Sequence, residues 1–148
     1  MLFIVKLLFL IFTILCYYLL CLHVVLAEHH TALHEQHQDY VGIVNTNLQI
    51  APMIQTISDH VQEICEVNYG ACPDVTIDGH IRTVMAYIPV HIEYMMTELL
   101  KNSMRASVEH SQKISRLHHP PIQVTIGRGD NEVTIRIRDQ GGGVPYSG

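Results

Sequence analysis

Three side chains whose chemistry suits catalysis or ligand binding recur at helical spacing in the second half of the chain. Glu98, Asn102 and Arg105 are separated by four and three residues. At about 100° per residue, this spacing places them in one stripe on the surface of a helix. The stripe combines a carboxylate, an amide and a guanidinium group. A solvated helix face has the same pattern, so the stripe alone does not establish a site.

A glycine-rich segment, residues 139–145, supplies the second candidate. It reads Asp-Gln-Gly-Gly-Gly-Val-Pro and directly follows an alternating segment that is typical of a strand. Three successive glycines after a strand indicate a backbone that takes unusual dihedral angles or closely approaches a ligand. A flexible connection would have the same composition, and that interpretation also stays open at this point.

Histidines and cysteines offer a weaker candidate for metal chemistry. Four histidines lie between residues 28 and 38, and His30 and His34 would share one helix face, as two metal ligands could. No third ligand is indicated, and the segment is also compatible with the solvated end of a helix. The four cysteines have the spacing of neither a disulfide framework nor paired zinc knuckles, so we interpret them as reduced, partly buried thiols.

The residues around these candidates predict an α+β arrangement. Apolar residues at spacings of three and four predict a helix over 52–69, ended by Gly70, and a second helix over about 90–110. Between them, residues 73–78 and 82–88 alternate as two strands that we expect to pair as a hairpin. Residues 122–126 and 133–137 alternate across a turn and predict a second hairpin.

The second predicted helix carries the stripe on one side, so its other side must face the core. That inner side is expected to consist of Ile92, Met96, Leu99 and Ser103, with Met95 and Ala106 at its edge. The outer side is expected to consist of Tyr94, Glu98, Asn102, Arg105 and Glu109.

The first 27 residues form an apolar leader in which only Lys6, Thr13 and His23 are not apolar. Such a run is long enough to cross a bilayer as a helix. A cleaved secretory signal is the alternative, although the run is longer than a usual signal core and only Lys6 precedes it as a basic residue. A wrongly predicted start of the gene is a third interpretation. A mitochondrial presequence fits poorly, because such segments are rich in arginine and the first arginine here is Arg82.

The charge of the chain excludes one class of function. Nine Lys and Arg residues against 14 Asp and Glu residues give a net charge of −5 over 148 residues. This excludes a nucleic-acid-binding protein that depends on a broad basic surface. The length suits one modest domain.

The order of the motifs is more specific than any of them alone. A helix with Glu98, Asn102 and Arg105, then a hairpin, then Asp139-x-Gly-x-Gly resembles the N box and first glycine box of the ATPase/kinase superfamily of heat-shock chaperones, type II topoisomerases and histidine kinases. Within that superfamily, ELLKNSMRA and DQGGGVP resemble the mitochondrial protein kinases of 2-oxoacid dehydrogenase complexes. The resemblance covers residues 26–148. It implies a partial α/β sandwich of the histidine-kinase-like ATPase type, preceded by the apolar helix.

The resemblance also implies a protein serine kinase with ATP and Mg²⁺ as cofactors. Asn102 would hold the Mg²⁺ ion, for which an amide oxygen is a suitable hard ligand. Glu98 would be the general base that accepts the proton of the substrate serine. Asp139 would accept a hydrogen bond from the adenine amino group, and Gly141 and Gly143 would let the loop fold against the nucleotide.

Partners and location follow from the same resemblance. The substrate would be the decarboxylase alpha subunit of a 2-oxoacid dehydrogenase complex in the mitochondrial matrix, with the acyltransferase core as a second partner. Family members dimerise, and Arg105 would lie within reach of phosphate. Tyr94 stands where pyruvate dehydrogenase kinases typically have histidine, and residues 78–80 read Asp-Gly-His. Both features favour the branched-chain kinase over the pyruvate dehydrogenase kinase.

These interpretations divide the chain into three parts. Residues 1–27 would be the leader, which could contact a membrane, residues 28–39 a remnant of the regulatory helical bundle, and residues 40–148 the N-terminal part of the kinase domain. The sequence stops before the ATP lid and second glycine box, so we expect the chain by itself to bind ATP weakly or not at all and to lack kinase activity. Two alternatives stay open: a non-catalytic, partner-binding remnant, and a membrane sensor histidine kinase with His34 as phosphoacceptor.

Overall fold

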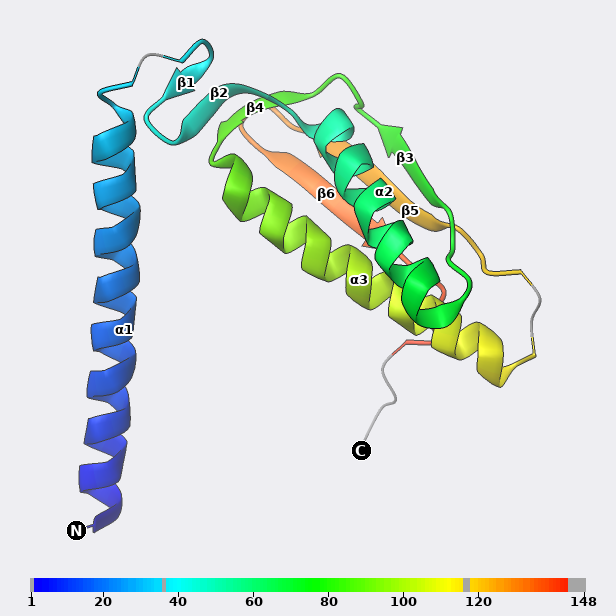
Figure 1. The fold of residues 1–148 in the computed structure, drawn as a ribbon, viewed down its shortest axis with the longest axis horizontal. Helices are drawn as coiled ribbons and strands as arrows, with labels where there is room; N and C mark the ends of the chain where they lie inside the picture. The colour runs from blue at the N-terminus through cyan, green and yellow to red at the C-terminus, as the bar shows by residue number, and fades with distance from the viewer. Residues whose placement is uncertain (1, 36, 116–117, 144–148) are drawn as a thin grey trace. The chain divides into compact units, whose positions relative to one another are not determined.

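The computed structural model describes residues 2–35, 37–115 and 118–143, in which it assigns three helices and six strands (Figure 1). The chain divides into two compact units, Met1–Thr46 and Asn47–Gly148. An α+β fold preceded by an apolar helix, as predicted from the sequence, is confirmed.

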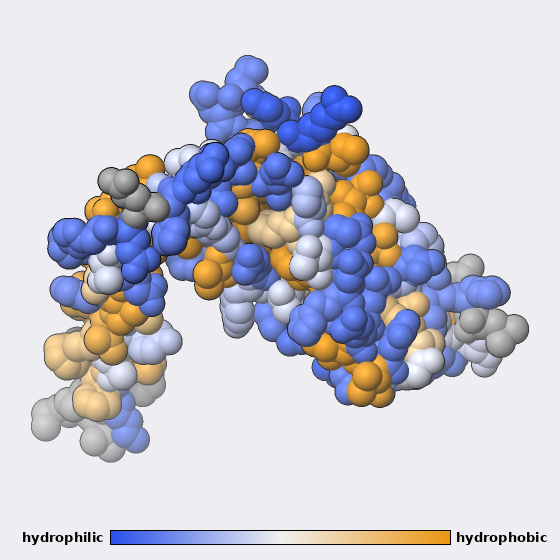
Figure 2. Space-filling model, turned by 45° about the horizontal axis from the view of Figure 1, so that its top comes forward, coloured by the Kyte–Doolittle hydropathy of each residue, from blue (hydrophilic) through white to orange (hydrophobic). Residues whose placement is uncertain are grey.

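Helix α1 (Leu2–Ala32) is apolar on all sides, and most of its apolar side chains that the structure describes are exposed (Figure 2). The hydroxyl of Thr13 donates to the carbonyl of Phe9 at 2.8 Å, so this polar group is satisfied by the helix itself. The ring nitrogen Nδ1 of His23 likewise lies 2.6 Å from the carbonyl oxygen of Leu19. The segment Phe9–Ala32, with a mean hydropathy of 2.5, is long and apolar enough to cross a membrane. A signal sequence near the N-terminus meets the same criterion.

A short hairpin follows α1 and was not predicted from the sequence. Strand β1 (Tyr40–Val41) pairs with the start of β2 (Val44–Gln49) in antiparallel register. Gly42 takes the turn with a φ of 59°. A side chain at that position would collide with the ring of His29, whose Nδ1 lies 3.3 Å from the backbone nitrogen of Ile43. His29 therefore holds the turn in place.

Helix α2 (Ile50–Tyr69) confirms the predicted helix and its end. Its buried side chains recur at helical spacing and are Ile50, Ile54, Ile57, Ser58, Val61 and Cys65. Gly70 closes the helix in the left-handed conformation, with a φ of 72°, and its N–H donates to the carbonyl of Glu66 at 2.8 Å. Glycine adopts this conformation without the steric cost of a Cβ atom.

The predicted pairing of the two strands after α2 is wrong. Strand β3 (Val75–Gly79) pairs in parallel with β5 (Ile122–Arg128), whereas β4 (Val84–Tyr87) belongs to the other sheet, in the order β1-β2-β4. Hydrogen bonds within the Gly79–Thr83 turn lead the chain away from β3 instead of back along it. Pairing with β5 also lets Val75 and Ile77 pack against the apolar core. An isolated β3–β4 hairpin would have no such core to bury these side chains.

The second predicted hairpin is confirmed, and its first strand, β5, is the central strand of the main sheet. β5 pairs with β6 (Val133–Arg138) in antiparallel register, which gives the order β3-β5-β6. The side chains of Ile122, Val124 and Ile126 on the inner face of β5 are fully buried. Helices α2 and α3 (Pro89–Lys113) lie side by side on this face (Figure 1), and the three elements share one apolar core.

Helix α3 confirms the predicted second helix, but one predicted core position is wrong. Leu99 is 51% exposed, and the neighbouring Leu100 is completely buried instead. The buried side of α3 consists of Ile92, Met96, Leu100, Ser103, Met104, Ser107, Val108 and Ser111. Three of these are serines, so apolarity alone did not define the inner face, and Leu99 was wrongly placed on it.

Candidate functional site

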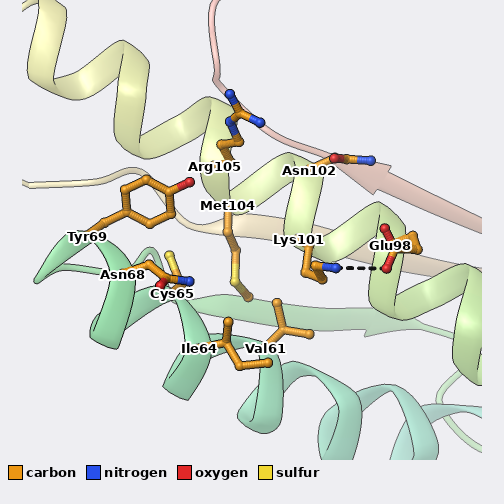
Figure 3. A pocket seen from close by; sticks show the side chains of 10 residues that line it. All are labelled: Val61, Ile64, Cys65, Asn68, Tyr69, Glu98, Lys101, Asn102, Met104 and Arg105. Carbon is orange, nitrogen blue, oxygen red and sulfur yellow. Dashed lines mark hydrogen bonds and ion pairs between the residues drawn. The ribbon is translucent and has the colours of Figure 1, made fainter.

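The predicted stripe on α3 borders a hollow between α2 and α3 (Figure 3). The hollow has a volume of about 290 Å³. Its lining residues are Val61, Ile64, Cys65, Asn68 and Tyr69 from α2, with Glu98, Lys101, Asn102, Met104 and Arg105 from α3. The floor is therefore apolar and the α3 rim is polar. The structure brings Glu98, Asn102 and Arg105 together at this rim, as their spacing predicted.

Glu98 is paired within its own helix. The Lys101 ammonium group lies 2.8 Å from Oε1 of Glu98, and this hydrogen bond raises the pKa of Lys101. Both side chains are partly exposed, and exposed ion pairs of this kind are weak. The carboxylate of Glu98 can therefore exchange Lys101 for another partner at little cost.

Arg105 is held by a neighbour one turn further along α3. Its Nε lies 2.7 Å from Oε1 of Glu109, and the hydrogen bond lowers the pKa of Glu109 and raises that of Arg105. In Figure 3 the Arg105 side chain points away from α2, whereas Met104 points toward it. Contact with Glu109 through Nε leaves the two terminal nitrogens of the guanidinium group to bind an anion.

Asn102 lies between these two ion pairs and takes part in neither. Its side chain is exposed, and within the described part of the chain no hydrogen bond to its amide is found. An exposed amide oxygen without a protein partner is free to ligate a hard cation or to accept from a ligand.

The glycine-rich loop folds onto the same helix. A Cβ atom at Gly141 would lie 2.5 Å from the Cβ and 2.8 Å from the carbonyl carbon of Ala106, so only glycine permits this approach. Ala106 follows Asn102 by one helical turn, which places the loop beside the stripe. The sequence predicted unusual dihedral angles or a close approach to a ligand at this loop. The close approach that the structure shows is to α3, and approach to a ligand stays a prediction.

Asp139 shapes the start of this loop. Its Oδ1 accepts a hydrogen bond from the Gly141 N–H at 2.9 Å, which forms a tight turn. Gly142 and Gly143 have φ values of 84° and 72°, as expected for glycines that take left-handed conformations. Asp139 itself is exposed. The predicted loop residues Val144 and Pro145 lie outside the described residues.

Two residues of the hollow were not foreseen from the sequence. Asn68 and Tyr69 belong to the last turn of α2, directly before its glycine cap. Their position next to α3 depends on how the two helices pack, and no local pattern in the sequence indicates it.

The weaker metal candidate finds no support among the described residues, where no three His, Cys, Asp or Glu side chains are grouped to hold an ion. The rings of His30 and His34 instead contact each other edge to face, with centroids 5.1 Å apart. All four cysteines are free thiols; Cys65 is buried and Cys72 half-buried, whereas Cys16 and Cys21 are exposed rather than partly buried.

Comparison with known proteins adds an independent line of evidence. No family model matches the chain. A mitochondrial pyruvate dehydrogenase (acetyl-transferring) kinase of Arabidopsis thaliana is 35% identical over 108 residues, which is 73% of this chain and 29% of the relative. Enzymes with the same name from Schizosaccharomyces pombe and Drosophila melanogaster are both 33% identical, over 72% and 73% of this chain. The chain is homologous to the mitochondrial pyruvate dehydrogenase kinases.

This homology agrees with the family that the two motifs resemble. The chain spans between 25% and 29% of the length of these pyruvate dehydrogenase kinases. The three relatives are named for pyruvate dehydrogenase, so the preference for the branched-chain kinase, which rested on Tyr94 and residues 78–80, stays a prediction.

Proposed function

We propose that residues 40–148 carry the nucleotide-contacting helix and glycine loop of an ATP-dependent protein serine kinase. One observation carries the proposal: the Asp139–Gly143 loop folds onto α3 at Ala106, one turn from Asn102 and two turns from Glu98. Along one face of α3, the Glu98 carboxylate is followed by the free Asn102 amide and then by Ala106, against which the backbone of the glycine loop packs. Homology to pyruvate dehydrogenase kinases supports the same activity.

The residues present fit a nucleotide and its magnesium ion. Asn102 would hold Mg²⁺ through its free amide oxygen. Asp139 uses one oxygen for its own loop, and the second can accept from the adenine amino group. Gly141 and Gly143 keep the loop backbone open to the nucleotide, and Arg105 can bind phosphate oxygens. When bound, Mg²⁺ supplies the neutralisation of phosphate charge that phosphoryl transfer requires.

Glu98 would accept the proton of the substrate serine hydroxyl. This role requires the carboxylate to leave Lys101, which the weakness of an exposed ion pair permits. Lys101 then remains close to the site as a second cation. Its position one turn from Arg105 suits an anionic substrate such as a triphosphate.

The protein substrate would be the decarboxylase alpha subunit of a mitochondrial 2-oxoacid dehydrogenase complex, with its acyltransferase core as docking partner and a kinase dimer as the working form. Names of the relatives support the pyruvate dehydrogenase complex and a mitochondrial location. Tyr94 and the Asp-Gly-His at 78–80 support the branched-chain complex. Phosphorylation assays with both purified complexes distinguish the two.

Nucleotide binding by the full chain in detergent tests the proposal without requiring turnover. We expect millimolar Mg·ADP to shift backbone NMR signals of Glu98–Ala106 and Asp139–Gly143. The D139N variant should lose these shifts, because its amide presents a donor as well as an acceptor to the adenine amino group. The matched variant D59N changes an exposed carboxylate on α2 and should keep them.

Two results would contradict the proposal. One is a set of shifts that D139N leaves unchanged, and the other is a set confined to surfaces away from α3 and the glycine loop. The N102A variant adds a separate test of the metal. It should remove the difference between shifts measured with and without Mg²⁺ while shifts caused by the adenine group remain.

A further inference from the structure

Three sulfur atoms from separate elements converge below the hollow between α2 and α3. Cys65 lies on the buried side of α2, Cys72 lies in the segment between α2 and β3, and Met104 lies on the buried side of α3. None of them belongs to the polar rim assigned to nucleotide binding. Cys65 and Met104 form part of the hollow's apolar floor (Figure 3).

The end of α2 explains why the two cysteines meet. Gly70 reverses the chain in the left-handed conformation, so the residues after it fold back over the last turns of the helix. The Cys65 thiol lies 3.7 Å from the carbonyl oxygen of Ala71, the residue next to Cys72. Cys65 and Cys72 are therefore near neighbours in space although seven positions separate them.

Met104 completes the group from the opposite helix. Its Sδ lies 3.7 Å from Sγ of Cys72. Metal–sulfur bonds are about 2.3 Å long, so two sulfurs bound to one trigonal ion lie roughly 4 Å apart. The observed separation of the Cys72 and Met104 sulfurs is close to that spacing.

We propose that Cys65, Cys72 and Met104 form a binding site for a single Cu(I) ion. Thiolate and thioether sulfurs are soft ligands and select Cu(I). Structural Zn²⁺ sites use four ligands and no thioether, and the described residues supply no fourth His, Cys, Asp or Glu here. The ion enters through the hollow, where Cys65 and Met104 are part of the wall.

Two of the three proposed ligands are almost completely buried. Cys65 is 4% exposed and Met104 is 1% exposed, with Val61 beside them. On binding, the Cys65 and Cys72 thiols each release a proton to solvent as their sulfurs bond to copper, because thiolates and not thiols ligate metal ions. Met104 binds as a neutral thioether, and no electron is transferred.

The same burial argues against other roles for these thiols. A reactive cysteine needs a lowered pKa and an electropositive, accessible surrounding, and Cys65 and Cys72 have neither. A disulfide between Cys65 and Cys72 would also leave the position of the Met104 sulfur unexplained. A site that uses all three sulfurs accounts for the position of each.

Anaerobic titration of the full chain in detergent with Cu(I), against the chelator bicinchoninate, tests this assignment. The reference chain carries C16S and C21S, because the exposed thiols of α1 could bind copper themselves. We expect one tightly bound Cu(I) per reference chain. Removing a residue that hydrogen-bonds to a metal ligand typically weakens metal affinity by about 10–100-fold. C72S removes a ligand itself, so we expect it to lower Cu(I) affinity by at least that factor.

The M104L variant is the most specific test. Leucine keeps the apolar volume and removes only the sulfur, a kind of exchange that cores tolerate. We expect M104L to remain folded by hydrogen exchange and to lose Cu(I) affinity at least about 10-fold. Unchanged affinity in M104L, no stoichiometric binding by the reference chain, or tighter binding of Zn²⁺ than of Cu(I) would each overturn the proposal. The nucleotide proposal does not depend on the result.

Discussion

Helices α1 and α3 are both long, but they place their apolar residues in different ways. In α1 apolar side chains occur on every side, and most of those described are exposed, such as Phe9, Tyr17 and Leu20. In α3 they are concentrated on one side, which packs against α2 and β5. The opposite side carries the polar stripe with Glu98 and Asn102.

The difference shows that the arrangement of apolar residues matters more than their number. A helix with one apolar side can bury that side in a water-soluble core and still present polar groups to a ligand. A helix that is apolar all round has no polar side to leave in water, so it suits a bilayer or the interior of a large protein. Among the described residues, the helical members of the core cluster belong to α2 and α3, which are helices of the first kind and also line the candidate site.

The largest effect is expected at the core-facing side of α3. L100A removes a completely buried side chain and should lower the free energy of unfolding of the Asn47–Gly148 unit by about 2–5 kcal/mol. L99A, one residue earlier, removes a half-exposed side chain and should cost well under about 1 kcal/mol. Native-state hydrogen exchange of the β5 amides measures both. If L100A and L99A lowered the free energy of unfolding equally, the assignment of Leu100 to the buried side of α3 and of Leu99 to its exposed side would be wrong.

A charge in α1 should act on the membrane and not on the core. We expect L20R, near the middle of the apolar span, to weaken membrane insertion by about 2.5–3.5 kcal/mol and to shift the chain out of the membrane fraction. L33R introduces the same charge just after the span and should leave the distribution unchanged. Hydrogen exchange in β5 should be the same in both variants. A change in that exchange would show that α1 contributes to the core after all.

The smallest effect is expected on the polar side of α3, at the ion pair of Glu109 with Arg105. The Arg105 hydrogen bond lowers the pKa of Glu109 below its ordinary 4.5 in the folded state. The pair therefore stabilises the fold fully above pH 4.5, and this contribution disappears as the pH falls through the lower, folded-state pKa. Urea midpoints of the parent and E109Q should differ slightly at pH 7 and converge in acid or at high salt. A difference between the two urea midpoints that grows toward acid pH would contradict a lowered pKa of Glu109 in the folded state.

Local signals in the sequence were sufficient for several elements. The spacing of Ile54, Ile57 and Val61 together with Gly70 defined α2 and its end. Alternation in residues 122–126 and 133–137 defined the β5–β6 hairpin. The helical spacing of Glu98, Asn102 and Arg105 predicted one shared face, because neighbouring turns of a helix fix that relation without help from the rest of the chain.

Other features depended on competition between distant segments. Proximity along the chain suggested that β3 would pair with β4, but β3 buries Val75 and Ile77 better beside β5. Strand–helix–strand patterns often indicate parallel pairing, and the order β3, α3, β5 carried that signal. The β1–β2 hairpin is too short, and its side chains too exposed, for apolar alternation to reveal it.

The sequence by itself determined the helices and all strands except the β1–β2 hairpin, where α2 ends, and which family the two motifs resemble. These depend on residue types at fixed short spacings. Only the tertiary structure decided that Leu100 rather than Leu99 faces the core, that Gly141 lies against Ala106, and that Cys72 meets Met104. Each of these contacts joins segments or faces whose relative position depends on how the whole core packs, and close packing leaves little freedom once that arrangement is fixed.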